Sequence, residues 1–362
     1  MKILFRLFCL TGILYGITAC QSENDLMSIE QDVSTQIEVD ELRPVNHQVR
    51  GEAVVADGLL SPVGVELVRP LQGLVVAEAG TGNNDGRVTL VRGRKKYVLI
   101  DNFPSNVRSD GNIEGTTHIA VCRNVLWIVN GFSGELYRFD LSRYQLGQEP
   151  IAAENLPAQD VRAFVFNAGF TDSNLYDIVA DERGNLLITD SGANIVIKRR
   201  RDGQLSIFTR IPPLPNPSPI GEPTVEAVPT GIAYNGRYFS VAAFGGFPFA
   251  EGSSRIYRIG PNGNIIDFTD GYTTLIEAEG THRARHGALY ALQLGTFGET
   301  GFTPNSGALV RATPQGPEVI IEGLDFPNGL EVLRGGQQTK FFITSLTEGT
   351  LTAYLVGDQA SL

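Results

Sequence analysis

The sequence predicts an all-β fold, a six-bladed β-propeller, and three observations carry this prediction. A short segment close to Pro-x-Gly-aliphatic precedes a hydrophobic strand six times along the 362 residues. Its spacing of roughly 45–60 residues is the period of propeller blades or solenoid units. Short runs with alternating apolar and polar residues follow each copy, as half-buried strands require. A strand missing from the last unit stands at the start of the domain, which indicates a closed ring.

The six entry segments divide into two groups. Three keep both proline and glycine: Pro62-Val63-Gly64, Pro229-Thr230-Gly231 and Pro327-Asn328-Gly329. Three are degenerate, and we place them at Thr116-Thr117-His118-Ile119, Leu175-Tyr176-Asp177-Ile178 and Thr273-Thr274-Leu275-Ile276. His118 and Asp177 therefore stand where a plain scaffold keeps glycine or a neutral spacer.

Each unit divides into four strands, separated by turn signals such as Arg201-Asp202-Gly203. The last unit has only three obvious strands. The fourth stands at the beginning of the domain, because residues 52–59 resemble residues 318–324, which precede the last entry segment. An open array would expose an unpaired edge, whereas a ring uses this strand to close its last blade. We therefore predict one propeller over residues 51–362.

The N-terminus carries a targeting signal. Lys2 and Arg6 flank a hydrophobic run over residues 7–17, and Ile17-Thr18-Ala19-Cys20 follows. A basic start, a short apolar core and small residues are typical of a secretory signal. Cys20 in this setting resembles a bacterial lipobox; an ordinary signal peptide or a short membrane anchor is the alternative. We expect a lipoprotein signal peptide over 1–19 and lipidated Cys20 with a disordered tether over 20–50. The protein is then anchored to a membrane of the cell envelope.

The net charge argues against one class of partner, nucleic acids. The net charge is −11, which disfavours a nucleic-acid partner on electrostatic grounds. The basic cluster Lys198-Arg199-Arg200-Arg201 falls at a strand end beside a tight turn, where it is most simply a solvated edge.

Four segments, taken in order along the domain, resemble one known family. They are residues 75–86, residues 187–194, residues 227–232 with 246–253, and residues 323–330. On these segments the chain resembles the ScyD/ScyE family, which is similar to NHL and SMP-30-type propellers. The resemblance implies a six-bladed propeller and leaves the biochemical activity unsettled.

In a propeller the entry loops share one face with the loops after the second strands, and the longest loops of this chain fall there. Polar and aromatic side chains converge on this face. The ligand-binding candidates are Glu78, His118, Asn130, Asp177, Asp190, Phe247, Phe249 and Asn328. Plainer interpretations exist: Asp190 bonds its own loop, His118 is a satisfied histidine, and the phenylalanines cover the channel mouth.

These observations favour a module that binds a small molecule or a protein at the long-loop face, with catalytic residues unassigned. The alternative is a metal-dependent lactonase or hydrolase. It follows from the resemblance to SMP-30-type lactonases, which hold a divalent metal in the central channel. On that interpretation Glu78, Asp177 and Asn328 are the metal candidates, and oxygen ligands suit Ca²⁺. The sequence contains no nucleophile elbow and no phosphate loop after a strand.

Overall fold

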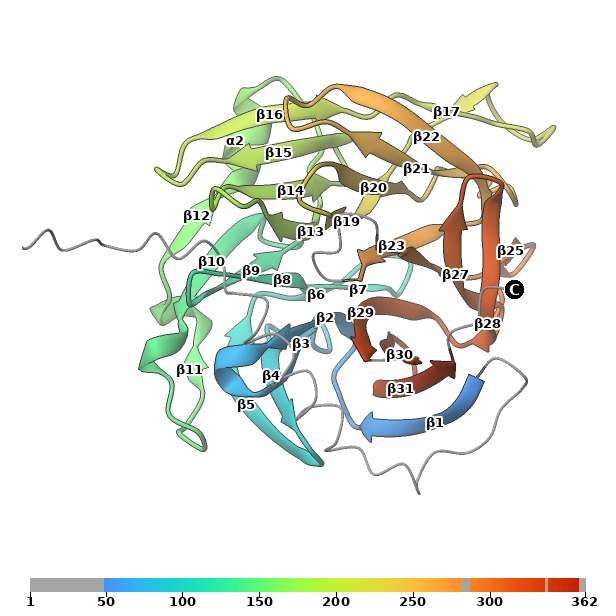
Figure 1. Ribbon diagram of the computed structural model, residues 1–362. Helices are drawn as coiled ribbons and strands as arrows, with labels where there is room; N and C mark the ends of the chain where they lie inside the picture. Colours follow the sequence, from blue (N-terminus) through green and yellow to red (C-terminus); the bar gives the residue numbers. More distant parts are fainter. Residues whose placement is uncertain (1–48, 282–286, 336–337, 358–362) are drawn as a thin grey trace, which may run out of the picture.

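The computed structural model describes residues 49–281, 287–335 and 338–357, which form six antiparallel sheets around a central axis (Figure 1). The predicted six-bladed β-propeller is confirmed. In every blade the first strand lies at the axis and the later strands lie further out. The predicted signal peptide, Cys20 and nearly all of the predicted tether lie outside the described residues.

The first three blades each run through four strands from the axis outward. Blade 1 has β2 (Pro62–Val68), β3 (Gly73–Glu78), β4 (Gly86–Arg92) and β5 (Lys95–Phe103). Blade 2 has β8 (Thr116–Cys122), β9 (Val125–Asn130), β10 (Glu135–Asp140) and β12 (Ala158–Asp160). Blade 3 has β13 (Leu175–Ala180), β14 (Leu186–Asp190), β15 (Ile195–Arg199) and β16 (Leu205–Arg210).

The second half of the ring follows the same order. Blade 4 has β19 (Pro229–Tyr234), β20 (Phe239–Ala243), β21 (Ser254–Ile259) and β22 (Ile265–Tyr272). Blade 5 has β23 (Leu275–Gly280), β24 (Leu289–Gln293), β27 (Gly307–Thr313) and β28 (Gly316–Leu324). Blade 6 has β29 (Pro327–Gly335), β30 (Gln338–Ser345), β31 (Thr350–Gly357) and, from the other end of the chain, β1 (Val49–Ala56).

Shorter elements decorate this scaffold. Three small hairpins and one helix lie in the connections to the next blade or after a second strand: β6 (Asn106–Val107) with β7 (Ile113–Glu114), β17 (Leu214–Pro215) with β18 (Thr224–Val225), β25 (Phe297–Gly298) with β26 (Gly301–Phe302), and α2 (Val161–Asn167). All of them therefore lie on the predicted long-loop face. The remaining short elements are β11 (Ile151–Ala152), which pairs with β5, and the 3₁₀ turns Arg69–Leu71, Leu141–Arg143 and Ala153–Asn155. In the described part of the chain, none of the helices has the length and apolar character needed to cross a membrane.

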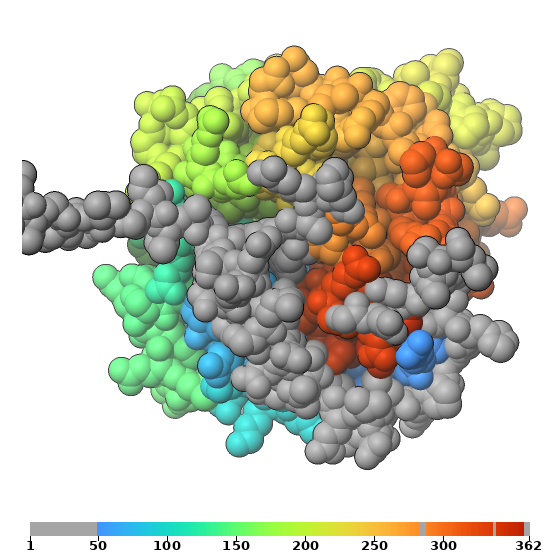
Figure 2. Space-filling model, in the orientation of Figure 1, coloured from blue at the N-terminus to red at the C-terminus, as the bar shows by residue number. Residues whose placement is uncertain are grey.

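The ring closes as predicted. β1 pairs antiparallel with β31, from Val49 opposite Val356 to Ala56 opposite Leu351, and so supplies the outer strand of blade 6. The N-terminal and C-terminal strands consequently lie side by side, as the adjacent blue and red segments show (Figures 1 and 2). Neighbouring blades pack through shared apolar clusters; Leu90 of blade 1 and Leu126 of blade 2, for example, belong to the same one. The pairing with β1 covers the edge of β31 that an open array would leave unpaired.

Every inner strand carries a register shift near its beginning. In blades 1, 2, 3, 4 and 6 the shift lies between the first and fourth residues of the strand, and in blade 5 it lies between Leu275 and Glu277. Such bulges bend a strand and re-aim its side chains, and they are over-represented next to active sites. Each inner strand therefore presents its second and third residues at the central channel.

The glycine of the entry motif is required by close packing rather than by backbone conformation. A Cβ on Gly329 would overlap the carbonyl oxygen of Val63 on the neighbouring inner strand, and one on Gly64 would lie 2.7 Å from His118 Cδ2. The left-handed backbone instead falls just before the strand, with φ of 48° at Ser61 and 39° at Phe326. The repeated glycine thus reflects how tightly the six inner strands approach one another.

This packing predicts a large effect for a single methyl group. Gly329→Ala is expected to lower the free energy of unfolding by about 2 kcal/mol or more, because a rigid backbone oxygen occupies the space. Gly298→Ala is the control, since a Cβ there meets no atom within 4 Å. Urea unfolding of both variants checks the prediction, and equal midpoints for the two would contradict it.

Candidate functional site

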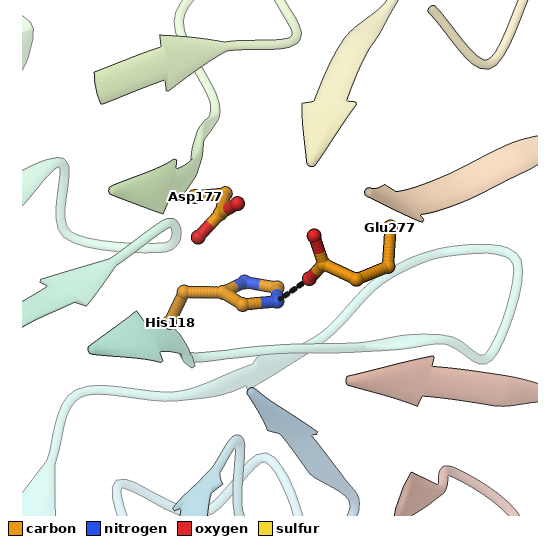
Figure 3. Close-up of side chains that lie close together, drawn as sticks. All are labelled: His118, Asp177 and Glu277. Atoms are coloured by element: carbon orange, nitrogen blue, oxygen red, sulfur yellow. Dashed lines mark ion pairs between the residues drawn. The ribbon is translucent and has the colours of Figure 1, made fainter. Parts of the chain in front are cut away.

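Six equivalent positions surround the channel, one on each inner strand. Around the ring they are Gly64, His118, Asp177, Gly231, Glu277 and Gly329. Three blades contribute only a glycine, and the other three contribute an ionisable side chain. Figure 3 shows these three side chains pointing toward one another from β8, β13 and β23.

His118, Asp177 and Glu277 form one compact cluster, which we call the triad. One ligand atom from each lies within 4.8 Å of the other two. His118 Nε2 is 2.8 Å from Glu277 Oε2, and this ion pair joins inner strands on opposite sides of the channel. Both side chains are only 5 % exposed. Asp177 is likewise buried. The triad therefore sits where solvent screening is weak and charges interact strongly.

The glycines make the space that the triad occupies. The His118 ring lies against Gly64, and the Glu277 carboxylate lies against Gly231. A side chain at either glycine would displace the neighbouring triad residue. Glycines and triad residues therefore form one packing unit around the channel.

Hydrogen bonds fix the tautomer of His118. Its Nδ1 lies 3.0 Å from the carbonyl oxygen of Tyr176, which can only accept, so Nδ1 carries a hydrogen. Nε2 is buried and faces Glu277 Oε2 at 2.8 Å, and in the described part of the chain it has no other partner. A histidine held through Nδ1–H by a carbonyl, with Nε2 directed at carboxylates, has the arrangement of a metal ligand.

Main-chain amides orient the two carboxylates. Asp177 accepts one hydrogen bond of 2.6 Å from its neighbour Ile178 and another of 2.6 Å from Ile232 on blade 4. Glu277 Oε1 accepts a hydrogen bond of 2.7 Å from the amide of Ala278, which leaves Oε2 to face His118. Both oxygens of Asp177 and one oxygen of Glu277 are thus held by backbone amides, which fixes the two carboxylates beside His118.

Burial and mutual proximity shift two pKa values in the triad. Burial lowers the pKa of His118, but Asp177 and Glu277 outweigh this effect and raise it to about 9. Burial, and then the negative charge of Glu277, raise the pKa of Asp177 to about 7. Without a metal ion the cluster is therefore held together by a proton on His118.

The residues present fit a divalent cation. Ligand atoms bound to one ion at about 2.0–2.6 Å lie within about 4–5 Å of each other, which matches the spacing of the triad. The donor set is one imidazole nitrogen and two carboxylates, all buried. His118 Nε2, which faces Glu277 Oε2, supplies the lone pair once its proton leaves. A divalent ion would replace that proton as the positive charge between the carboxylates.

The structure places three other sequence-predicted candidates outside the triad, at the ends of second strands. Glu78 accepts from the amide of Leu60 and pairs with Arg87 at 2.8 Å. Asn130 donates to the carbonyl of Pro104 and accepts from the amide of Ser133. Asp190 accepts from Ser173, Asn174 and Ala193. These side chains tie loops to their blades, so the predicted convergence of Glu78 with Asp177 at a metal does not form.

The remaining candidates lie nearer the channel or on the long-loop face. Asn328 is buried and accepts a 2.6 Å hydrogen bond from the Tyr176 hydroxyl. Phe247 and Phe249 join an aromatic cluster with three further rings: Phe244, Phe297 and Phe302. Phe247 is 60 % exposed, whereas Phe244 is buried.

Glu277 is not among the sequence-predicted candidates, because the fifth entry segment lies two residues later than the repeat pattern predicts. The inner strand of blade 5 begins at Leu275, so Leu275-Ile276-Glu277 corresponds to Leu175-Tyr176-Asp177. Thr273-Thr274 imitates the Thr116-Thr117 pair of blade 2 and so suggests the wrong register. The correct register is seen in the strand pairing, since Leu275 lies opposite Gln293 as Leu175 lies opposite Asp190.

Comparison with known proteins identifies the fold class. The search against family models returned no match, and no curated protein sequence matches. Solved structures do match: a gluconolactonase from Xanthomonas campestris has 13 % identity and a TM-score of 0.54, covering 88 % of this chain and 96 % of its own. The PQQ-bound aldose sugar dehydrogenase of Streptomyces coelicolor has 14 % identity and a TM-score of 0.54, with coverages of 84 % and 96 %.

A third structure extends the same class. The calcium structure of a Trichoderma reesei protein of carbohydrate-active enzyme family AA12 has 11 % identity and a TM-score of 0.53, covering 87 % of this chain and 99 % of its own. The chain therefore shares its propeller fold with these three structures. At these identities the likeness concerns the fold, and function has to be argued from the site.

Proposed function

We propose that this protein is a divalent-metal-dependent hydrolase of the lactonase type, with the reacting centre at the triad. The observation that carries the proposal is the buried convergence of His118 Nε2 with the carboxylates of Asp177 and Glu277. The fold shared with a gluconolactonase supports the same reaction class, ring-opening of a cyclic ester by water. A binding module at the long-loop face is the second candidate, favoured by the exposed ring of Phe247.

His118, Asp177 and Glu277 are the residues that would hold the ion. When bound, a divalent ion acts as a Lewis acid that polarises an ester carbonyl. The amides of Ile178, Ile232 and Ala278 keep the carboxylates in place, so the ligands are oriented when the protein folds rather than during reaction. Burial excludes bulk water from the triad and strengthens every charge interaction there.

The donor set favours Zn²⁺ or Mn²⁺ over the Ca²⁺ expected from the sequence. Calcium takes six to eight oxygen ligands, whereas imidazole suits zinc and other first-row transition metals. His118 contributes a nitrogen, and its Nδ1–H to the Tyr176 carbonyl fixes that nitrogen toward the carboxylates. We therefore assign the site to a transition metal within the broader class of divalent cations.

The cellular setting is part of the same proposal. We propose that the chain is a ScyD/ScyE-like lipoprotein, anchored to an envelope membrane through Cys20 and acting on a small molecule. Cys20→Ser is expected to release the protein from the membrane fraction of its native cells. Unchanged retention of the variant would contradict the anchor without touching the catalytic proposal.

Activity is tested with a panel of sugar, alkyl and aryl lactones, following acid release by pH-stat. Protein loaded with Zn²⁺ or Mn²⁺ is expected to open at least one lactone, and EDTA or Asp177→Ala is expected to reduce the rate by roughly 100-fold or more, since either removes the Lewis acid. Asp190→Asn, a buried carboxylate outside the triad, is the matched control and should retain activity. Metal binding without turnover of any lactone would favour the binding module.

A further inference from the structure

Tyr176 packs directly on the triad. As a residue Tyr176 is half-buried, whereas His118, Asp177 and Glu277 are all buried. The centroid of its ring lies 4.8 Å from that of the His118 ring, with the planes inclined at 49°. It directly precedes Asp177 on the bulge of β13. Tyr176 therefore covers one side of the triad.

The Tyr176 side chain also spans the channel. Its hydroxyl donates a 2.6 Å hydrogen bond to Asn328 Oδ1 on β29, and β13 and β29 are opposite inner strands in the ring. Tyr176 is the second residue of its inner strand. The second residues of the six inner strands are Val63, Thr117, Tyr176, Thr230, Ile276 and Asn328. Tyrosine is the largest residue among them, so only this side chain has the length to bridge the ring from one side.

The main chain and the side chain of Tyr176 have separate contacts. The carbonyl holds His118 Nδ1, while the phenol donates its hydrogen bond to the neutral amide of Asn328. A neutral hydrogen bond contributes only modestly to net stability. The phenol can swing out while the carbonyl keeps His118 in its tautomer.

We propose that Tyr176 is the gate of the triad. Rotation of its side chain breaks the bond to Asn328, opens the channel and admits a metal ion or a substrate carbonyl. The size of the opening then limits which esters reach the triad, which makes Tyr176 an access-determining residue. This inference rests on the proposed metal site.

The rate of metal entry tests the gate. Full-length protein is mixed with Co²⁺ in a stopped-flow instrument, and binding is followed by the visible absorption of the ion. Tyr176→Phe keeps the ring and loses the donor, and Asn328→Ala loses the acceptor. Both variants are expected to bind Co²⁺ about two- to tenfold faster than the unaltered protein, the factor that one hydrogen bond supports. Asn328→Ala also serves if Tyr176→Phe fails to fold.

The control is Tyr272→Phe, which removes another buried tyrosine hydroxyl, one that lies 3.2 Å from the Thr269 hydroxyl on the outer strand of blade 4. Its Co²⁺ association rate is expected to be unchanged. If the unaltered protein and all three variants bound Co²⁺ at the same rate, the gate proposal would be wrong, while the proposed metal site would still stand. Absence of Co²⁺ binding to the unaltered protein, measured by equilibrium dialysis, would overturn the proposed function and the gate with it.

Discussion

Replacing Asp177 with alanine is expected to abolish the stabilisation that Zn²⁺ or Mn²⁺ gives to the protein. An ion present at about 100 times its Kd stabilises the folded state by about 2.7 kcal/mol, which raises Tm by about 5 °C. Asp177 contributes one of only two carboxylates in the triad. Its loss leaves two ligands, so the rise in Tm should disappear. Differential scanning calorimetry with and without the ion gives the measurement.

The basal stability of the variant is a separate matter. Asp177→Ala also leaves the amides of Ile178 and Ile232 without their acceptor, so its metal-free Tm should fall. Asp190→Asn controls for this effect, because it weakens a buried carboxylate that ties a loop and lies outside the triad. That variant should start lower and still respond to metal. A full metal response in Asp177→Ala would show that the ion binds elsewhere.

In the absence of metal, the free energy of unfolding is expected to fall as the pH rises from 6.5 to 9. The pKa of His118 is raised from 6.5 to about 9 in the folded protein, because Asp177 and Glu277 outweigh the opposing effect of burial. A raised pKa means stability that is complete below pH 6.5 and lost as the pH passes 9. A shift of this size corresponds to at most about 3 kcal/mol.

The raised pKa of Asp177 also makes the free energy of unfolding fall as the pH rises, in this case between pH 3.8 and about 7. Urea unfolding in EDTA at about pH 6 and about pH 9 measures the combined effect. In His118→Gln the free energy of unfolding is expected to change much less with pH above pH 6.5. With metal present, the free energy of unfolding is expected to rise with pH instead, because the ion and the proton compete for Nε2. If His118→Gln lost as much stability over this pH range as the unaltered protein does, the pH dependence would belong to other groups.

The fold could be predicted from the sequence because its signal is repeated. Six entry segments at blade spacing and the strand displaced to the N-terminus determine both the number of blades and the closure of the ring. The entry glycines are informative for a reason visible only in three dimensions. Gly329 and Gly64 are needed where neighbouring inner strands touch, not where the chain turns.

The site could be predicted only in part. His118 and Asp177 stand out because they replace a repeated glycine, and the structure brings both into the triad. Glu277 is hidden by an entry segment without proline, in which two threonines imitate another blade. Glu78 and Asp190 look equally suitable in the sequence, but they lie at the ends of second strands, where loop amides and hydroxyls and, for Glu78, Arg87 occupy their oxygens away from the triad. Such occupancy depends on loop conformation, which residue type alone does not determine.

The most direct test of the central claim is anomalous diffraction from crystals soaked in Zn²⁺ or Mn²⁺. We predict one strong anomalous peak in the channel, bound by His118 Nε2 and by carboxylate oxygens of Asp177 and Glu277, with the His118–Glu277 contact replaced by metal bonds. A channel without a peak at saturating metal, with His118 still paired to Glu277, would contradict the account. The triad would then be a buried ion network of the propeller scaffold.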